Sequence, residues 1–352
     1  MNKKGRVLII YTGGTFGMDL SLGASKRKIL SPLELSPLEL SANLRTRVPE
    51  LERLADCDVV IAMNRDSAHV GPDEWRELAL LIQRKCSKYE GVVVLHGTDT
   101  MAYTSTALSF LLRPCLKPVI LTGAQRPLSA IRTDARSNLI SAVEIAASGS
   151  KSGIKQVCIF FDHKLYQGNR VRKRSASDYG AFDSPLCAPL AVVGTEIRYS
   201  KVKRTMKSGA EKMLANFDRE VALIHVTPSF PSRAIRERLL GGVSALVLVV
   251  FPSGTAPTHE LEFVRLLQDA KRKGIPVVLV AEGQEEDAVD GFGADSPRFL
   301  YAAGEALLKE GGIWAGTMTP EAAFVKTAWL LKQPNAVPEF DRRFRINYAG
   351  EF

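Results

Sequence analysis

Short apolar runs alternate along the chain with longer segments in which apolar residues recur at helical spacing. Val92 to Leu95 is one such run, and a continuous apolar stretch of this length favours a strand buried on both faces of a parallel sheet. Trp75, Leu78 and Ile82 recur instead on one face of a helix. The repeated alternation predicts an α/β fold with a doubly wound sheet.

The predicted elements fall into two groups along the chain. In the first group we expect strands at residues 6–11, 57–63, 92–95, 118–122 and 156–161, helices at 37–48, 75–86, 102–112 and 133–147, and a long loop at 12–36. In the second group we expect strands at 221–226, 245–250 and 276–280, and helices at 231–240, 260–273, 298–308 and 320–331.

Between the two groups the composition shifts to Lys, Arg, Ser and Gly, with few apolar residues. Such a segment is typical of a domain connection. We therefore predict a larger N-terminal α/β domain over residues 1–195, a basic linker over 196–219, and a smaller C-terminal parallel α/β domain over 220–352.

Composition and charge exclude several classes of partner. The net charge of +9 is divided among separated basic groups, and no aromatic motif of an RNA-binding module lies between them, so we expect no nucleic-acid partner. No apolar run approaches the roughly 18 residues of a membrane span, so we expect no membrane partner. The five cysteines are odd in number and lack CxxC spacing, which predicts neither a disulfide framework nor a zinc site. We expect a cytoplasmic protein without a metal or organic cofactor.

Polar residues follow three of the predicted parallel strands, at the point where each strand ends. They are Thr15 on a Gly13-Gly14 turn, the pair Asp66-Ser67, and the pair Thr98-Asp99. Ligands of open parallel sheets gather at this edge, and adjacent glycines allow backbone N–H groups to approach a ligand closely. The sequence therefore predicts a binding or catalytic site there.

The residues alone leave alternatives open. Thr98 and Asp99 can serve only to cap the following helix, and Lys173, in a basic run, can belong to a solvated surface. A dinucleotide site is disfavoured because GxGxxG is absent, and no Gly-x-Ser-x-Gly motif accompanies a histidine. A threonine hydroxyl can still act as a nucleophile where a lysine in a suitable environment removes its proton.

Three segments of the chain resemble the hallmark segments of L-asparaginases, particularly the cytoplasmic type I group. They are Thr12-Gly13-Gly14-Thr15, His96-Gly97-Thr98-Asp99-Thr100, and Gly168-Asn169-Arg170 with Lys173. Weaker similarity extends over nearly the whole chain.

The resemblance implies the two-domain asparaginase fold and hydrolysis of L-asparagine to L-aspartate and ammonia through a covalent acyl-enzyme. It implies Thr15 as the nucleophile, with Thr98, Asp99 and Lys173 as the second catalytic group. It also implies that substrate is bound by Asp66, Ser67, Gly14, Thr98 and Asp99, with backbone N–H groups near Gly14 and Thr98 around the developing oxyanion. A homodimer or homotetramer without cofactor is the implied assembly.

The chain departs from the family at the loop after the nucleophile. Relatives usually carry a tyrosine there, whereas no tyrosine occurs between Tyr11 and Tyr89. The missing tyrosine suggests one alternative to an asparaginase, an asparagine-binding sensor with weak or no turnover. A second alternative, from a neighbouring enzyme class, is a glutamine-preferring or transamidation-linked amidohydrolase.

Overall fold

In the computed structural model, the apolar run becomes strand β5 (Gly91–Leu95), and all of its residues are buried. It lies inside an eight-stranded sheet with the order β12-β11-β8-β7-β6-β5-β1-β4. The other strands are β1 (Gly5–Gly13), β4 (Ala55–Arg65), β6 (Val119–Thr122), β7 (Val157–Phe161), β8 (Lys164–Gln167), β11 (Ala191–Val193) and β12 (Ile197–Tyr199). The structure describes residues 4–22, 28–32, 36–115, 117–200, 214–239, 241–282 and 301–352.

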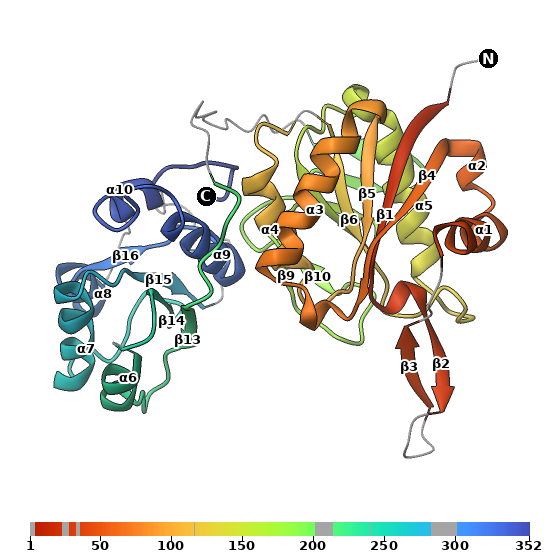
Figure 1. Ribbon diagram of the computed structural model, residues 1–352. Helices are drawn as coiled ribbons and strands as arrows, with labels where there is room; N and C mark the ends of the chain where they lie inside the picture. The colour runs from red at the N-terminus through yellow and green to blue at the C-terminus, as the bar shows by residue number, and fades with distance from the viewer. Residues whose placement is uncertain are drawn as a thin grey trace. The chain divides into compact units, whose positions relative to one another are not determined.

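Strands β4, β1, β5, β6 and β7 run parallel, whereas β8, β11 and β12 pair antiparallel with their neighbours. Helices cover both faces of this mixed sheet (Figure 1). The helices are α1 (Pro37–Arg47), α2 (Leu51–Leu54), α3 (Pro72–Lys85), α4 (Met101–Leu111) and α5 (Ala135–Ser148). Alternate residues of a strand face opposite sides of the sheet, and helices bury both sides. Every residue of a central strand therefore faces a core, which explains the continuous apolar runs.

Neighbouring residues of β1 show this division. Val7 and Ile9 pack in the core that contains α1 and α5, whereas Leu8 and Ile10 pack with α3 and α4. The predicted doubly wound α/β architecture is confirmed, with the antiparallel strands as an addition.

The predicted start of α1 is also confirmed. Ser36 Oγ accepts a hydrogen bond from Glu39 N at 3.3 Å, and Glu39 Oε2 accepts one from Ser36 N at 2.8 Å. This reciprocal cap, together with Pro37 in the first turn, sets where the helix begins.

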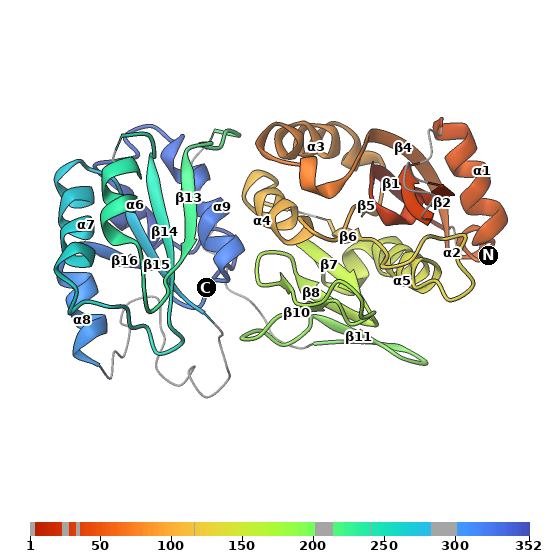
Figure 2. The ribbon, with the colours of Figure 1, turned by 90° about the horizontal axis from the view of Figure 1, so that it is seen from below.

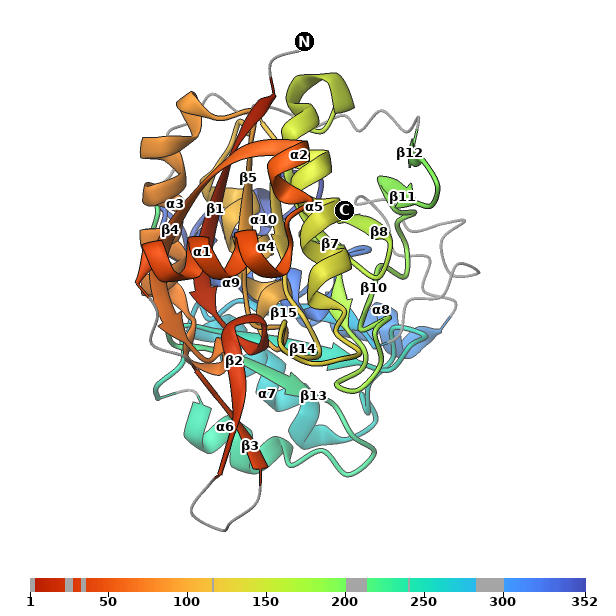
Figure 3. The same ribbon diagram turned by 90° about the vertical axis from the view of Figure 1, so that its right-hand side faces the viewer.

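The long loop predicted at residues 12–36 is wrong in part. This segment contains the antiparallel strands β2 (Met18–Leu22) and β3 (Lys28–Pro32), whose hairpin extends away from the main sheet (Figure 3). Residues 18–22 alternate between apolar and polar side chains, but residues 28–32 do not, so the sequence offered a pattern for only one of the two paired strands.

The second unit of the structure has its own parallel sheet with the order β13-β14-β15-β16. Its strands are β13 (Val221–His225), β14 (Ala245–Val250), β15 (Val277–Ala281) and β16 (Gly312–Trp314), and its helices are α6 (Ser232–Leu239), α7 (Leu261–Arg272), α8 (Ala302–Lys309), α9 (Pro320–Leu331) and α10 (Phe340–Phe344). Helices α6, α7 and α8 lie on one side of this sheet and α9 on the other (Figure 2). The smaller parallel α/β domain expected from the sequence is present.

The contacts divide the chain into residues 1–203 and 204–352. Strand β12 lies within the segment predicted as a linker and pairs with β11 in the large sheet. Residues 201–213, which include most of the remaining basic run, lie outside the described residues, and the limits of the linker stay a prediction. Among the helices that the structure describes, none is long and apolar enough to cross a membrane.

A buried ion pair fixes the end of the chain in the second unit. Lys326 Nζ on α9 lies 2.6 Å from Glu351 Oε1, and both side chains are completely buried. Glu351 also accepts hydrogen bonds from the backbone N–H groups of Tyr348 and Ala349, and Lys326 Nζ lies 4.3 Å from the centre of the Phe352 ring. The pair therefore ties the last residues to α9.

Because removal of one partner leaves the other charge buried, we expect Lys326→Met to lower the free energy of unfolding by roughly 3 to 5 kcal/mol. The double variant Lys326→Met/Glu351→Gln should recover much of this loss, since no full charge then stays buried. Urea unfolding followed by tryptophan fluorescence measures the change in the free energy of unfolding, because the Trp329 ring packs against Tyr348. Arg233→Met, at an exposed ion pair, is the control and should leave the unfolding midpoint nearly unchanged. A double variant less stable than Lys326→Met would contradict this explanation.

Candidate active site

The turn after β1 depends on two glycines. Gly13 and Gly14 have φ of 113° and 82°, in the region that favours glycine. A side chain on Gly13 would meet the Arg65 carbonyl oxygen at 2.1 Å, and one on Gly14 would meet the Gly97 Cα at 2.4 Å. The turn therefore fits tightly between the segments that follow β4 and β5.

The turn after β5 is packed just as closely. A side chain on Gly97 would lie 2.6 Å from Ser67 Cβ and 2.7 Å from Ser67 Oγ. Thr12 Oγ1 donates to the Leu95 carbonyl at 2.9 Å, and Thr100 Oγ1 donates to the Ser67 carbonyl at 2.6 Å. The three strand ends predicted to share one edge are thus in direct contact.

Lys173 joins this edge from a distant part of the sequence. It lies on β9 (Arg172–Lys173), which pairs antiparallel with β10 (Phe182–Asp183). Its Nζ donates to Thr98 Oγ1 at 2.7 Å and to Asp99 Oδ1 at 2.6 Å. The structure therefore brings Thr98, Asp99 and Lys173 together as one polar group.

This geometry corrects two interpretations that the sequence left open. Helix α4 begins after Thr100 without a side-chain cap, so the suggestion that Asp99 caps it is wrong. Lys173 has a side chain only 15% exposed, so its assignment to a solvated surface is wrong as well. The ion pair that Asp99 forms with Lys173 takes the carboxylate away from the helix end.

The remaining predicted site residues lie on the turns after β1 and β4, which contact the turn after β5. Thr15 begins a short 3-10 helix, η1 (Thr15–Gly17), and is partly exposed next to the Gly13-Gly14 turn. Ser67 is buried. Asp66 is exposed, and its carboxylate accepts a hydrogen bond from Ala68 N at 2.9 Å. No group of three or more His, Cys, Asp or Glu side chains that could hold a metal ion occurs within the described ranges.

His96, between β5 and the catalytic threonine candidate Thr98, is part of a buried hydrogen-bond chain. The Trp75 indole N–H donates to Thr104 Oγ1 at 3.0 Å, Thr104 lies 3.0 Å from His96 Nε2, and His96 Nδ1 lies 2.7 Å from the Gly97 carbonyl. Since a carbonyl only accepts, Nδ1 carries the hydrogen and Nε2 accepts from the threonine hydroxyl. Burial lowers the pKa of His96 to about 4, although the hydrogen bond to Gly97 acts in the opposite direction. His96 is therefore a neutral support of the turn.

Gln125, which follows β6, contacts the site from another strand end. Thr98 Oγ1 donates to its Oε1 at 3.3 Å. The sequence pattern did not single out this glutamine, because a lone amide after a strand has no distinctive spacing.

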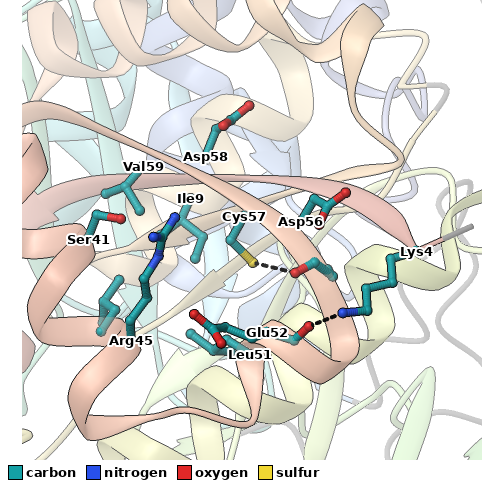
Figure 4. A pocket seen from close by; sticks show the side chains of 12 residues that line it. Lys4, Ile9, Ser41, Arg45, Leu51, Glu52, Asp56, Cys57, Asp58 and Val59 are labelled. Atoms are coloured by element: carbon teal, nitrogen blue, oxygen red, sulfur yellow. Dashed lines mark hydrogen bonds between the residues drawn. The ribbon is translucent and has the colours of Figure 1, made fainter.

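A separate pocket of about 410 Å³ lies between α1, α2 and the start of β4 (Figure 4). Its lining includes Arg45, Glu52 and Cys57 but none of the predicted site residues. Burial raises the pKa of the Cys57 thiol to about 11, which makes this cysteine a poor nucleophile at neutral pH.

Comparison with known families agrees with the two-domain fold. The family model described as Asparaginase, N-terminal matches residues 6–205, and the model described as Glutaminase/Asparaginase C-terminal domain matches residues 220–344. The chain therefore belongs to the asparaginase family.

Individual relatives make the relation more specific. The chain is 33% identical to L-asparaginase 1 of Escherichia coli (strain K12), over 100% of this chain and 98% of that protein. It is 31% identical to a Glutamyl-tRNA(Gln) amidotransferase component of Pyrococcus horikoshii, over 98% of this chain and 76% of that protein. Among solved structures, L-asparaginase I from Vibrio cholerae matches with a TM-score of 0.82 and 32% identity, over 99% of both chains. The predicted resemblance to type I L-asparaginases is confirmed.

The buried His96 predicts a specific pH dependence of stability. The unfolded chain takes up a proton near pH 6.5, whereas folded His96 takes one up only near pH 4, so acid favours the unfolded state. As the pH is lowered from about 6.5 to about 4, His96 should reduce the free energy of unfolding by up to about 1.4 kcal/mol per pH unit. His96→Gln should reduce the slope, and His259→Gln, at an exposed position, should not. Equal slopes for all three proteins in urea unfolding would rule out this role of His96.

Proposed function

We propose that this chain hydrolyses L-asparagine to L-aspartate and ammonia, with Thr15 as the nucleophile. The observation that carries the proposal is a pair of hydrogen bonds beside the turn that holds Thr15. Lys173 Nζ donates one to the Thr98 hydroxyl and the other to the Asp99 carboxylate. Family membership and the similarity to L-asparaginase 1 of Escherichia coli support asparagine as the substrate.

The reaction proceeds in two steps. Thr15 Oγ bonds to the side-chain amide carbon, its proton passes to Lys173 through Thr98 or an intervening water, and that proton then leaves with the amide nitrogen as ammonia. Water next attacks the resulting ester and breaks its bond to Thr15 Oγ; the hydroxyl of the water stays on the released L-aspartate, and a proton from the water restores the Thr15 hydroxyl. Backbone N–H groups near Gly14 and Thr98 stabilise the oxyanion, a contribution of roughly 3 kcal/mol per donor.

The polar groups around the turn suit a zwitterionic amino acid. The Asp66 and Asp99 carboxylates bind its α-ammonium group, and the Ser67 hydroxyl with nearby backbone N–H groups binds its α-carboxylate. Charge-assisted hydrogen bonds of this kind orient the amide for attack. Asp99 is suited to this task because its side chain is 65% exposed, although it also pairs with Lys173.

The proposal also includes the setting of the enzyme. All five cysteines are free thiols, which supports a reducing compartment such as the cytoplasm. We expect a homodimer or homotetramer and no metal or organic cofactor. Ammonia release with asparagine and with glutamine, measured side by side, decides the preferred amide, and binding of asparagine without ammonia release would favour the sensor alternative.

Thr15→Ala removes the nucleophile, so we expect it to lower kcat for asparagine by roughly 10³-fold or more. Coupled ammonia detection measures this loss. Thr46→Ala, at an exposed position of α1, is the matched control and should keep the activity of the unmodified chain. Near-normal turnover by Thr15→Ala would mean that the nucleophile is another residue.

Lys173→Met removes the proposed base, and we expect kcat to fall by at least about 100-fold. Lys173→Arg should not restore activity, because a guanidinium keeps its proton throughout the accessible pH range. Lys164→Met, at an exposed position of β8, serves as the control. Retention of most activity by Lys173→Met would exclude Lys173 as the base.

A further inference from the structure

The Gln125 side chain is held in one orientation. Its Nε2 donates to the Ser175 carbonyl at 3.3 Å and to the Asp178 carbonyl at 3.1 Å. Both partners only accept, so the amide nitrogen must face them and Oε1 must face Thr98. A flipped amide would set three carbonyl oxygens against one another.

The backbone of Gln125 is fixed as well. Its N–H lies 2.9 and 3.1 Å from the two carboxylate oxygens of Asp134, and the same carboxylate accepts from Arg126 N at 3.0 Å. Asp134 is buried at the start of α5. Side chain and main chain of Gln125 are therefore both anchored before any substrate is present.

This anchoring determines where the Thr98 hydrogen points. A Lys173 ammonium group can only donate, so Thr98 Oγ1 accepts from Nζ at 2.7 Å. The single hydroxyl hydrogen is then directed to Gln125 Oε1 at 3.3 Å. While Lys173 carries its proton, the bonds therefore run from Lys173 to Thr98 to Gln125; when Lys173 acts as the base, the Thr98 hydrogen turns to Nζ.

Gln125 also connects Thr98 to the segment that follows Lys173. Ser175 and Asp178 belong to a turn braced by Ser175 Oγ, which accepts from Asp178 N at 3.0 Å. The amide nitrogen of Gln125 holds this turn, while its oxygen holds Thr98. The Gln125 side chain therefore constrains both the Thr98 hydroxyl and the segment that follows Lys173.

We propose that Gln125 is a positioning residue of the hydrolysis: it aligns the Thr98 hydroxyl with Lys173 and holds the turn after Lys173. The proposal rests on the proposed asparaginase function. Without the amide, the Thr98 hydrogen has no fixed acceptor and the Lys173 segment loses a tether. Gln125 itself takes no proton and forms no bond with the substrate.

The experiment compares the unmodified chain with Gln125→Met, Gln125→Glu and the control Gln83→Met. Gln83 is an exposed glutamine on α3 whose Nε2 donates to the Leu111 carbonyl at 3.1 Å and which is not among the predicted site residues. Gln125→Met should lower kcat by about 10- to 100-fold with little change in KM, because alignment rather than binding is lost. Gln83→Met should keep both constants, and melting temperatures confirm that each variant is folded.

Gln125→Glu adds a readout that a purely structural role would not move. Its carboxylate would place a negative charge against the Thr98 hydroxyl that Lys173 also contacts, so kcat of this variant should depend on pH differently from kcat of the unmodified chain. Trypsin cleavage after the exposed Arg174 should also become faster in Gln125→Met, because the turn is released.

The outcomes separate this proposal from the proposed function. A Gln125→Met variant with unchanged kcat, or with only KM altered, overturns the positioning role. So does a Gln125→Glu variant whose kcat has the same pH dependence as that of the unmodified chain. If the unmodified chain releases no ammonia from asparagine, the proposed function is wrong. In that event the rate of cleavage after Arg174 still decides whether Gln125 anchors the turn, and equal rates in all variants overturn the anchoring.

Discussion

The contact between the Gly14 turn and Gly97 is the constraint on which the rest of the site depends. At both positions a methyl group would overlap neighbouring atoms at less than 3 Å, so the two backbones and Ser67 lie as close as atoms allow. This packing places the turn that carries Thr15 next to Thr98. The parallel pairing of β1 with β4 and β5 produces it, because it brings the carboxyl ends of these strands to one edge.

The Lys173 and Asp99 side chains beside this contact differ in how far they are exposed to water. The Lys173 side chain is mostly buried, while the Asp99 carboxylate is largely in contact with water. The buried member is suited to proton transfer, since its surroundings are fixed by protein, and the exposed member is suited to meeting a charged substrate. His96 supports the arrangement as a neutral group, because its burial keeps it unprotonated near neutral pH even though the hydrogen bond to the Gly97 carbonyl acts in the opposite direction.

The sequence was sufficient for the parts of the structure that local chemistry determines. The buried strands had continuous apolar runs, α1 had a capping serine followed by proline, and the strand ends had the polar residues of the site. The short strands β8 to β12 were missed because two to four residues carry too little pattern. Asp99 was misread as a possible cap because its true partner lies 74 residues away, and Gln125 was missed because only packing across 27 residues joins it to Thr98.

The claim that Thr15 is acylated can be tested most directly by mass spectrometry of the protein after acid quenching with L-asparagine. We predict a mass gain equal to one aspartyl group on the peptide that contains Thr15, which disappears in Thr15→Ala. An aspartyl adduct on a different peptide, or turnover with no adduct under any quench time, would contradict the acylation of Thr15.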